Sequence, residues 1–290
     1  MKKVVILGCE NSHADMFLNF MQQGGYEEMK VVGAYSDDPA AMKRLQDNFG
    51  VPPMTSFDEA VGKVDGVIVT ARHGDNHYTY AKPYIQNGAV MFIDKPITVS
   101  QQDALQLARD LKAAGVRVTG GSCCKHIEII QTLKREHLSE TGGKTVGGFF
   151  RAPVDLDNPY GDFFFYSQHL VEMVCEVYGY HPRAVHALTA NGVVNVTFRY
   201  DGFDVSGLYV HYNDAYFAAR CSVADTHAEE IVLDGDSACF RIELDDFYRL
   251  LLGGEQSRSL TEFIAPVFVL NAIYRSMQSG KEEPIEEYAI

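Results

Sequence analysis

The stretch VVILGCENSHADMFLNFMQQGG, residues 4–25, joins a short apolar run to an amphipathic segment through a turn that begins at Gly8. The apolar run favours a buried β-strand, because most of its residues are β-branched and none is polar. Ser12 is placed to cap a helix that ends at the glycine pair closing the stretch. A strand followed at once by a helix is the first half of a βαβ unit.

The same order repeats as far as about residue 121. We expect further strands at residues 30–35, 64–70, 89–93 and 117–119, and further helices at 39–49, 76–87 and 100–115, with Pro39 in a first helical turn and Ser100 as a cap. Strands that alternate with helices predict a parallel, doubly wound sheet with helices on both faces. Residues 1–121 are therefore expected to form a Rossmann-type dinucleotide-binding domain.

Beyond residue 121 the pattern changes. Two helices, 127–138 and about 169–178, are followed by strand-like segments at 184–188, 193–199, 205–211, 216–223, 228–233 and 238–244. Turn signals separate several of them: Asn191-Gly192, Asp201-Gly202 and Asp234-Gly235. A last helix places Phe263, Val267, Leu270, Tyr274 and Met277 on one face. We expect residues 122–290 to form an α+β domain with a large, mostly antiparallel sheet, used for substrate binding and oligomerisation.

Composition limits the classes of function. The chain has 290 residues, and its net charge of −14 argues against nucleic-acid and anionic-membrane partners, which require basic surfaces. The six cysteines form no Cys-x-x-Cys pair, and no spacing typical of a zinc site occurs, so we expect reduced thiols, a cytoplasmic location and no metal. No signal-peptide pattern begins the sequence, and no apolar run is long enough to span a bilayer.

The first turn reads Gly8-Cys9-Glu10-Asn11-Ser12-His13, at the position where a dinucleotide's pyrophosphate rests on a helix N-terminus. Gly8 suits the tight turn, and Asn11, Ser12 and His13 are candidate donors. Glu10 and His13 replace the two later glycines of the usual pattern. At roughly 5 Å and an effective dielectric near 20, the Glu10 charge costs about 3 kcal/mol against a phosphate charge. The alternative is a turn that binds nothing.

An acidic residue after the second strand usually bonds the adenosine ribose. Here Ser36 takes that slot and Asp37 follows it, with Asp38 next and no arginine beside them. Two carboxylates disfavour a 2′-phosphate, so NAD is favoured over NADP. A helix N-terminus that simply accommodates acidic residues remains the alternative.

The third candidate site is the turn Asp94-Lys95-Pro96, at the carboxyl end of an apolar strand. Side chains at this end of a parallel sheet point into the crevice where such sheets bind ligands. A partly desolvated lysine there can exchange a proton with a substrate hydroxyl. A solvated surface lysine is the alternative.

These motifs and their order resemble the glucose–fructose oxidoreductase and inositol dehydrogenase (Gfo/Idh/MocA) family. The family has Glu-Lys-Pro where this chain has Asp94-Lys95-Pro96, and a histidine-containing loop where this chain has TARHGDNH, residues 70–77. The C-terminal segment 271–285, NAIYRSMQSGKEEPI, also matches. The resemblance implies a nicotinamide cofactor, a homodimer or homotetramer, and cofactor contacts from Thr70, His73, His77, Asp94 and Lys95.

The family's second catalytic element is Asp-x-x-x-His, and here Phe165 and His169 occupy its two ends. The resemblance implies that Lys95 and His169 relay the substrate proton. Because the aspartate is absent, Asp162 or Tyr166 is a candidate replacement; the alternative for His169 is a histidine packed under the sheet. Aromatic residues at 160 and 163–166 suit a sugar ring, although such runs are more often core. Lys125, Arg151 and Asp155 are further candidate substrate contacts.

Three functions are consistent with these patterns. The first is an NAD(P)-dependent oxidoreductase acting on a sugar, polyol or related hydroxyl or carbonyl compound, with Lys95 and His169 as catalytic residues. The second is a catalytically altered or non-catalytic ligand-binding homologue, favoured by the departures at Glu10, His13 and Phe165. The third keeps the nucleotide but performs a lyase or hydrolase step without net oxidation.

Overall fold

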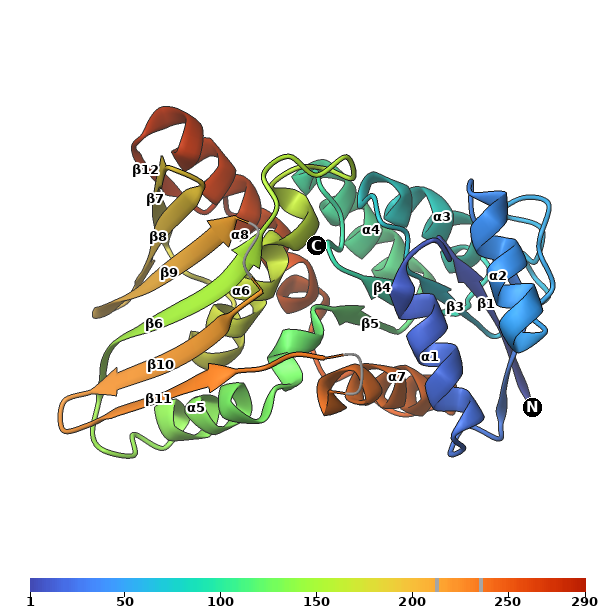
Figure 1. Cartoon of the computed structure of the whole chain (residues 1–290), viewed down its shortest axis with the longest axis horizontal. Coiled ribbons are helices and arrows are strands. Elements are labelled where there is room, and N and C mark those ends of the chain that lie inside the picture. The colour runs from blue at the N-terminus through green and yellow to red at the C-terminus, as the bar shows by residue number, and fades with distance from the viewer. Residues whose placement is uncertain (212–213, 235–236) are drawn as a thin grey trace. The chain divides into compact units, whose positions relative to one another are not determined.

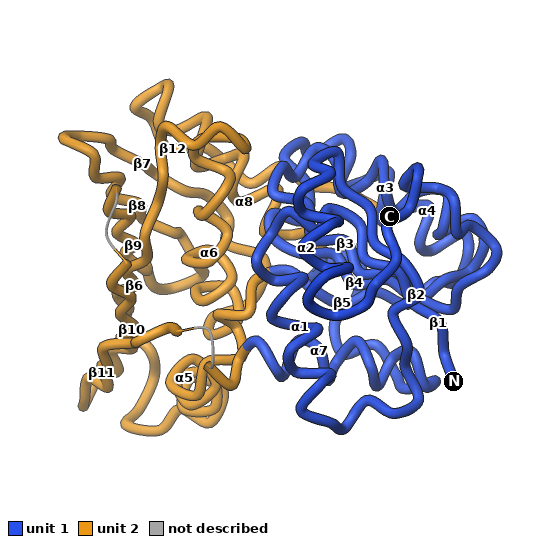
Figure 2. Tube along the Cα trace, turned by 45° about the vertical axis from the view of Figure 1, so that its right-hand side comes forward, with its two compact units in different colours: residues 1–121, 240–263, 290 blue, residues 122–239, 264–289 orange. Residues whose placement is uncertain are grey.

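The computed structural model describes residues 1–211, 214–234 and 237–290. The chain divides into two compact units, coloured separately in Figure 2. Unit 1 comprises residues 1–121, 240–263 and 290, and unit 2 comprises residues 122–239 and 264–289. This differs from the division expected from the sequence, in which all residues after 121 form the second domain, because segment 240–263 packs with unit 1.

Unit 1 is built on a parallel five-stranded sheet in the order β2-β1-β3-β4-β5, as expected for a doubly wound fold (Figure 1). Its strands are β1 (Lys2–Leu7), β2 (Met29–Tyr35), β3 (Gly66–Val69), β4 (Val90–Asp94) and β5 (Val118–Gly121). Its helices are α1 (Ser12–Gln22), α2 (Pro39–Phe49), α3 (Asp75–Ile85), α4 (Gln101–Ala114) and α7 (Ala238–Leu251), the first two residues of which belong to unit 2.

Local signals position these helices much as the sequence predicts. Pro39 opens α2, although Asp38 is the residue whose side chain caps it, and Ser100 caps α4 by accepting a hydrogen bond from the Asp103 N–H. The cap of α1 is Asn11 rather than Ser12, because the Asn11 side chain accepts the His13 N–H. The Ser12 hydroxyl is thereby left outside the capping interaction.

One face of this sheet buries a core shared by α1, α2 and α7. Side chains that alternate along the strands, such as Ile6 and Phe92, meet Phe17 of α1 and Phe247 of α7. The prediction of a strand at 238–244 was wrong, because alternate apolar residues there also fit a helix. Carried on to residue 251, the apolar positions recur every three or four residues, and that periodicity gives α7 its buried face.

Unit 2 is built on a seven-stranded sheet in the order β11-β10-β6-β9-β8-β7-β12. All neighbouring strands are antiparallel except β6 and β9, which are parallel. The strands are β6 (Thr145–Val154), β7 (Ala184–Ala190), β8 (Val193–Tyr200), β9 (Phe203–His211), β10 (Tyr216–Ser222), β11 (Thr226–Ile231) and β12 (Glu282–Pro284). The expected antiparallel character of this sheet is therefore confirmed for five of its six pairings.

Helix α6 (Phe164–Tyr178) packs on this sheet, and its Leu170 side chain lies so close to β9 that a Cβ on Gly207 would approach it to 2.9 Å. The remaining helical elements are η1 (Cys123–His126), α5 (Glu128–Leu138) and α8 (Leu260–Ser279), whose first residues belong to unit 1. The predicted apolar face of the last helix was wrong in part: residues 263–270 are buried all round, whereas Tyr274 is exposed.

The predicted turns agree where the structure describes them. Asn191 and Gly192 both have positive φ and join β7 to β8, as a tight hairpin requires. Residues 201–202 join β8 to β9, whereas Gly235 of the expected Asp234-Gly235 turn lies outside the described residues. Across the described ranges, none of the helices combines the length and the apolar character needed to cross a bilayer.

Candidate active site

The turn between β1 and α1 is closed tightly by backbone contacts. Gly8 has a φ of +78°, and the Gly8 and Cys9 N–H groups donate to the Tyr35 carbonyl at 2.8 and 3.2 Å. A Cβ on Gly8 would lie 2.2 Å from the backbone of Ala71, the second residue after β3. A glycine is therefore required here for both its conformation and its size.

The first turn of α1 offers backbone donors. Asn11 Oδ1 accepts the His13 N–H at 3.2 Å, but the N–H groups of Glu10 and Ser12 have no acceptor within the described parts of the chain. Unpaired N–H groups at a helix N-terminus favour an anionic ligand such as a phosphate. Of the residues predicted to hold the pyrophosphate, Glu10 and Ser12 therefore offer backbone N–H donors, whereas the Gly8 N–H is bonded to the Tyr35 carbonyl.

The Glu10 carboxylate spans the ends of three strands. It accepts the Ser36 hydroxyl, after β2, at 2.7 Å, and the Arg72 N–H, after β3, at 2.9 Å. Both oxygens are therefore neutralised in part by donors of the protein itself. The carboxylate nevertheless keeps a negative charge at the edge of the sheet where the turn offers its phosphate donors.

Asp37 lies exposed beside the buried Ser36 and is held by two tyrosines. The Tyr35 hydroxyl donates to its carboxylate at 2.6 Å and the Tyr80 hydroxyl at 3.0 Å. The hydrogen bond to Asp37 is the main cause that raises the pKa of Tyr35 to about 12. Each carboxylate oxygen can still accept another donor, so the predicted contact with ribose hydroxyls is compatible with this geometry.

Hydrogen bonds of Asp94 join the Asp94-Lys95-Pro96 turn to the N-terminal end of α1. The fully buried Asp94 carboxylate accepts His13 Nδ1–H at 2.6 Å, Asn11 Nδ2–H at 3.3 Å and the Lys95 N–H at 2.7 Å. The Lys95 side chain is only 4% exposed, and the Lys95–Pro96 peptide bond is cis. His13 and Asp94, both predicted cofactor contacts, therefore also contact each other.

Burial raises the pKa of the Asp94 carboxyl, but the charges and hydrogen bonds of His13 and Lys95 lower it more, from an ordinary 3.8 to about 2. Because the folded pKa is below the unfolded one, ionised Asp94 stabilises the fold above about pH 4, and this contribution is lost as the pH falls toward 2. Asp94→Asn should lower the free energy of unfolding at neutral pH by about 2 kcal/mol.

The measurement is urea unfolding at a series of pH values between 2 and 7. The difference between the Asp94→Asn variant and the parent protein should shrink as the pH falls through this window. Asp47→Asn, which removes an exposed carboxylate on α2, is the matched control. A difference that stays constant down to pH 2 would show that the ionised carboxylate is not the stabilising species.

The segment after β3 contains three further predicted contacts, two in the loop and His77 on α3, and they lie at different depths. Thr70 is fully buried and its hydroxyl donates to the Gly8 carbonyl at 3.1 Å. His77 is also fully buried, donates to the Ala71 carbonyl at 2.7 Å, and has its pKa lowered mainly by burial. Only His73 is partly exposed, next to Asp75. Thr70 and His77 therefore shape the loop, and direct cofactor contact stays a prediction.

His169, the second predicted catalytic residue, lies on α6 in unit 2. Its Nδ1 atom is 2.6 Å from Ser122 Oγ and 3.4 Å from Cys124 Sγ. Within the described part of the chain, its Nε2 atom has no hydrogen-bond partner. The imidazole is thus oriented through one nitrogen, which leaves the other available to exchange a proton.

Every polar atom of Ser122 takes part in a hydrogen bond. Its N–H donates to the fully buried Glu172 at 3.2 Å, its carbonyl accepts Lys125 Nζ–H at 2.8 Å, and its hydroxyl accepts the Cys124 N–H at 3.1 Å. Gln168 also donates to Glu172 at 2.8 Å. A buried, mutually bonded cluster of this kind fixes the position of the Ser122 hydroxyl, and through it the His169 ring.

The remaining predicted substrate contacts are spread over unit 2. Phe165, in the aspartate position, lies against Tyr160 and Tyr166, and the Tyr166 ring is 5.9 Å from that of His169. Asp162 is exposed before α6, with a φ of +47°. Arg151 lies partly buried on β6, and Asp155 accepts Asn158 Nδ2–H. The structure thus brings Tyr166, and not Asp162, into contact with the histidine.

Sequence reasoning missed Ser122, Cys124 and Gln168. The available signal was the pair Cys123-Cys124 directly after the last strand of unit 1, which was interpreted only as two reduced thiols. Burial raises the pKa of the Cys124 thiol, but hydrogen bonding with Cys123, the charge of His169, and hydrogen bonds with His169 and Ser122 outweigh it, so the pKa falls well below its ordinary value. No spacing rule links Ser122 or Cys124 to His169, which lies more than forty positions away, whereas Gln168 directly precedes it.

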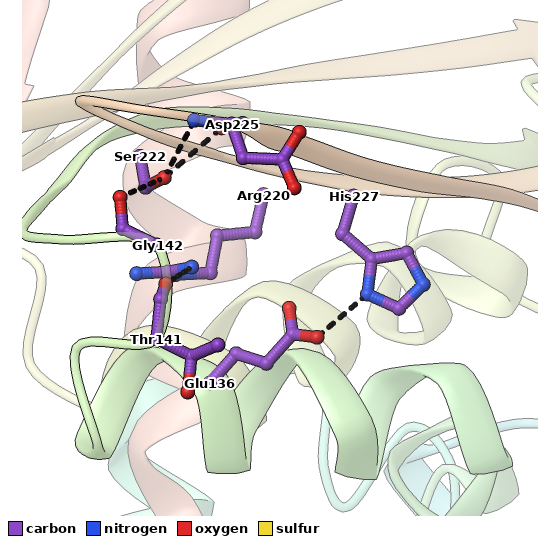
Figure 3. A pocket seen from close by; sticks show the side chains of 7 residues that line it. All are labelled: Glu136, Thr141, Gly142, Arg220, Ser222, Asp225 and His227. Atoms are coloured by element: carbon purple, nitrogen blue, oxygen red, sulfur yellow. Dashed lines mark hydrogen bonds and ion pairs between the residues drawn. The ribbon is translucent and has the colours of Figure 1, made fainter.

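A separate polar pocket of about 120 Å³ lies elsewhere in unit 2, between α5, β10 and β11 (Figure 3). The buried Arg220 guanidinium donates to Thr145 Oγ1 and to the carbonyls of Thr141 and Gly143, each at 2.9 Å. His227 is paired with Glu136 at 2.8 Å. These polar groups stabilise one another, so the pocket is explained as part of the fold.

Comparison with known proteins agrees with this geometry. Residues 2–122 match a family model described as an oxidoreductase family with an NAD-binding Rossmann fold. No curated protein sequence matches the chain.

Solved structures similar to this chain include scyllo-inositol dehydrogenase from Lactobacillus casei, with a TM-score of 0.84 at 12% identity over 98% of both chains. Myo-inositol 2-dehydrogenase from Lactobacillus plantarum has a TM-score of 0.82 at 14% identity, over 98% of this chain and 99% of that one. GenD2 from gentamicin A biosynthesis, in complex with NAD, has a TM-score of 0.85 at 16% identity, over 99% and 97%. At these identities the likeness shows a shared fold.

The family match includes the β1–α1 turn, the loop after β3 and the Asp94-Lys95-Pro96 turn, which are the segments described above for unit 1. Residues 2–122 therefore belong to the NAD-binding Rossmann domain of the glucose–fructose oxidoreductase and inositol dehydrogenase (Gfo/Idh/MocA) family.

Proposed function

We propose that the chain is an NAD-dependent oxidoreductase that acts on a hydroxyl or carbonyl carbon of a sugar, polyol or related compound. The observation that carries this proposal is the match of residues 2–122 to an NAD-binding oxidoreductase family, at a turn that offers unpaired backbone donors. The inositol dehydrogenases among the similar folds support the substrate class. A small polar substrate is the partner that such chemistry requires.

The residues of the β1–α1 turn fit a dinucleotide in most respects. Gly8 provides the tight turn, and the free N–H groups of Glu10 and Ser12 point to a phosphate site. The acidic residues Glu10, Asp37 and Asp38 surround the position after β2, which disfavours an additional 2′-phosphate and supports NAD over NADP. The Glu10 charge is the one feature that opposes phosphate binding.

When bound, a nicotinamide dinucleotide supplies the acceptor or donor of a hydride. The chain's own residues then have to move one proton. If Nδ1–H of His169 donates to Ser122 Oγ, the Nε2 lone pair is free to accept the proton of a substrate hydroxyl; the other tautomer presents Nε2–H and donates in the reverse direction. We propose Lys95 as the second group in this exchange, on the basis of its place at the carboxyl end of β4.

The test is steady-state absorbance at the band of reduced nicotinamide, with NAD and NADP, across a panel of sugars and polyols. Turnover of one or more members with a preference for NAD is expected. The panel result is combined with a titration of reduced cofactor, whose own fluorescence is easily followed because the chain contains no tryptophan.

A second candidate is the non-catalytic ligand-binding homologue, which is favoured by the Glu10 carboxylate and by the phenylalanine at position 165. Absence of binding at millimolar cofactor would support this candidate and contradict the proposed enzyme. Micromolar binding without turnover of any panel member would leave a cofactor-binding protein whose chemistry has been altered.

Glu10→Gln is expected to tighten binding of reduced cofactor about tenfold, which is about 1.4 kcal/mol. The amide keeps an acceptor for the Arg72 N–H but removes the negative charge near the pyrophosphate. The fluorescence titration measures the effect. Asp47→Asn makes the same change of net charge at an exposed site on α2 and should leave affinity unchanged. Equal or weaker binding in Glu10→Gln would show that the carboxylate does not oppose the cofactor.

We also propose a homodimer or homotetramer in the cytoplasm. The family resemblance supports the oligomer, and the six reduced cysteines support the location. Light scattering at working concentration tests the oligomer, and a monomer would contradict it.

A further inference from the structure

Two adjacent cysteines and the proposed catalytic histidine form a compact set of metal-binding atoms in unit 2. The two sulfur atoms of Cys123 and Cys124 and a ring nitrogen of His169 lie within 4.8 Å of one another. All three side chains are buried, with exposed fractions of 2%, 0% and 5%. Among the described residues, no other group of three cysteine, histidine or acidic side chains meets this condition.

The distances suit a single ion. Zinc binds thiolate sulfur at about 2.3 Å and imidazole nitrogen at about 2.0–2.1 Å, so tetrahedral geometry places those two ligand atoms about 3.6 Å apart. Cys124 Sγ and His169 Nδ1 are 3.4 Å apart, close to this edge length. The Cys123 sulfur lies within 4.8 Å of both other ligand atoms. The three atoms are therefore close enough together to bind one ion.

We propose that Cys123 Sγ, Cys124 Sγ and His169 Nδ1 bind one Zn²⁺ ion, with the fourth position open to water or to an oxygen of the substrate. Two thiolates and one imidazole are soft and intermediate ligands that select zinc over magnesium or calcium. Three protein ligands with an open position are typical of catalytic rather than structural zinc.

The catalytic part of this inference rests on the proposed function and replaces the proton-accepting role that it gave to His169, because a neutral imidazole that binds zinc through Nδ1 carries its proton on Nε2. A zinc ion at His169 would supply positive charge to the oxygen of the reacting carbon. An oxygen bound to zinc would lose its proton more readily, and that proton would pass to water. The hydride carries two electrons and one proton to the nicotinamide, and the hydroxyl proton leaves separately, so the substrate loses two electrons and two protons in all.

Ser122 distinguishes this proposal from a simple hydrogen-bonded histidine. Its hydroxyl lies 2.6 Å from the nitrogen that the metal would occupy, and it must release that nitrogen before zinc binds. It still accepts the Cys124 N–H afterwards. Ser122→Ala should therefore bind zinc about fivefold more tightly, because a hydrogen bond of about 1 kcal/mol no longer competes.

The experiment uses the intact 290-residue chain, reduced and stripped of metal with a chelator. Zinc is titrated against a chromophoric zinc indicator, and Co²⁺ is added separately as a spectroscopic probe. We expect one zinc per chain, and for cobalt a thiolate-to-metal charge-transfer band together with the intense visible bands of a tetrahedral ion. Cys124→Ser should weaken zinc binding by more than about a hundredfold, since loss of a ligand exceeds the 10–100-fold cost of losing an outer partner.

Cys221→Ser is the matched control, because this partly exposed thiol lies on β10 outside the cluster. It should bind zinc as the parent protein does. Circular dichroism checks that each variant is folded, and the cobalt spectrum of the parent protein decides the question if Cys124→Ser does not fold. Absence of the charge-transfer band in the parent protein, or zinc affinity equal in Cys124→Ser and Cys221→Ser, would overturn the proposal.

Activity separates this inference from the proposed function. Full activity in the metal-free protein would contradict a catalytic zinc while keeping the oxidoreductase. Stoichiometric zinc in a protein that turns over no panel substrate would keep the metal site and contradict the oxidoreductase.

Discussion

Lys95→Ala should lower kcat/KM with the substrate identified from the panel by about 10²–10⁴-fold, the usual contribution of a positioned acid or base. The lysine is only 4% exposed and follows β4 at the carboxyl end of a parallel sheet, where ligands of such folds bind. Affinity for reduced cofactor should change far less, because the phosphate donors belong to the β1–α1 turn. Steady-state kinetics and the fluorescence titration measure the two effects separately.

Lys63→Ala is the control, because Lys63 is an exposed lysine of the same unit that donates to the Glu59 carbonyl. It should retain full activity. Unchanged turnover in Lys95→Ala would remove the lysine from the chemistry, even if the enzyme itself proves active. A parallel His169→Gln variant is expected to lose activity as well, since it removes the group that is oriented by Ser122.

Gly8→Ala should lower the free energy of unfolding by more than about 3 kcal/mol, in the range typical of severe local damage. The added Cβ would lie 2.2 Å from the backbone of Ala71, and a backbone atom cannot rotate away. The φ of +78° adds a penalty of about 1–2 kcal/mol for any residue with a Cβ. Urea unfolding measures the total.

Gly50→Ala separates the conformational penalty of a positive φ from the steric clash of the added Cβ. Gly50 ends α2 with a φ of +69°, but no atom lies within 4 Å of the position of its Cβ. It should therefore show only the conformational penalty of about 1–2 kcal/mol. Equal losses in the two variants would mean that the approach of Gly8 to Ala71 is relieved by movement of the loop.

Much of unit 1 is predictable from local patterns. The strands at 30–35 and 89–93 are apolar runs that ended up within one residue of β2 and β4, and Pro39 opens its helix. Local patterns predicted the wrong element for segment 238–251, because Phe240, Ile242 and Leu244 alternate as strand residues do. Helical periodicity appears only when Phe247 and Leu251 are included, and those residues pack against strands more than 150 positions earlier.

The candidate site also has features that the sequence predicts and features that only the tertiary structure shows. Sequence alone placed Lys95 after a buried parallel strand and Glu10 in the phosphate turn, because the order of strands and helices determines which chain segments reach the carboxyl edge of a parallel sheet. The sequence also indicated that Ser36 has acidic neighbours, since Asp37 and Asp38 directly follow it in the chain.

Tertiary structure alone decided what each side chain contacts. It joined Asp94 to His13, turned Glu10 toward Ser36 and Arg72, and brought Ser122 and Cys124 to His169. The physical reason is that hydrogen bonds and metal-ligand distances of 2–4 Å depend on how separate helices and loops pack. Composition and periodicity specify the elements, whereas packing brings residues from distant positions into a shared site.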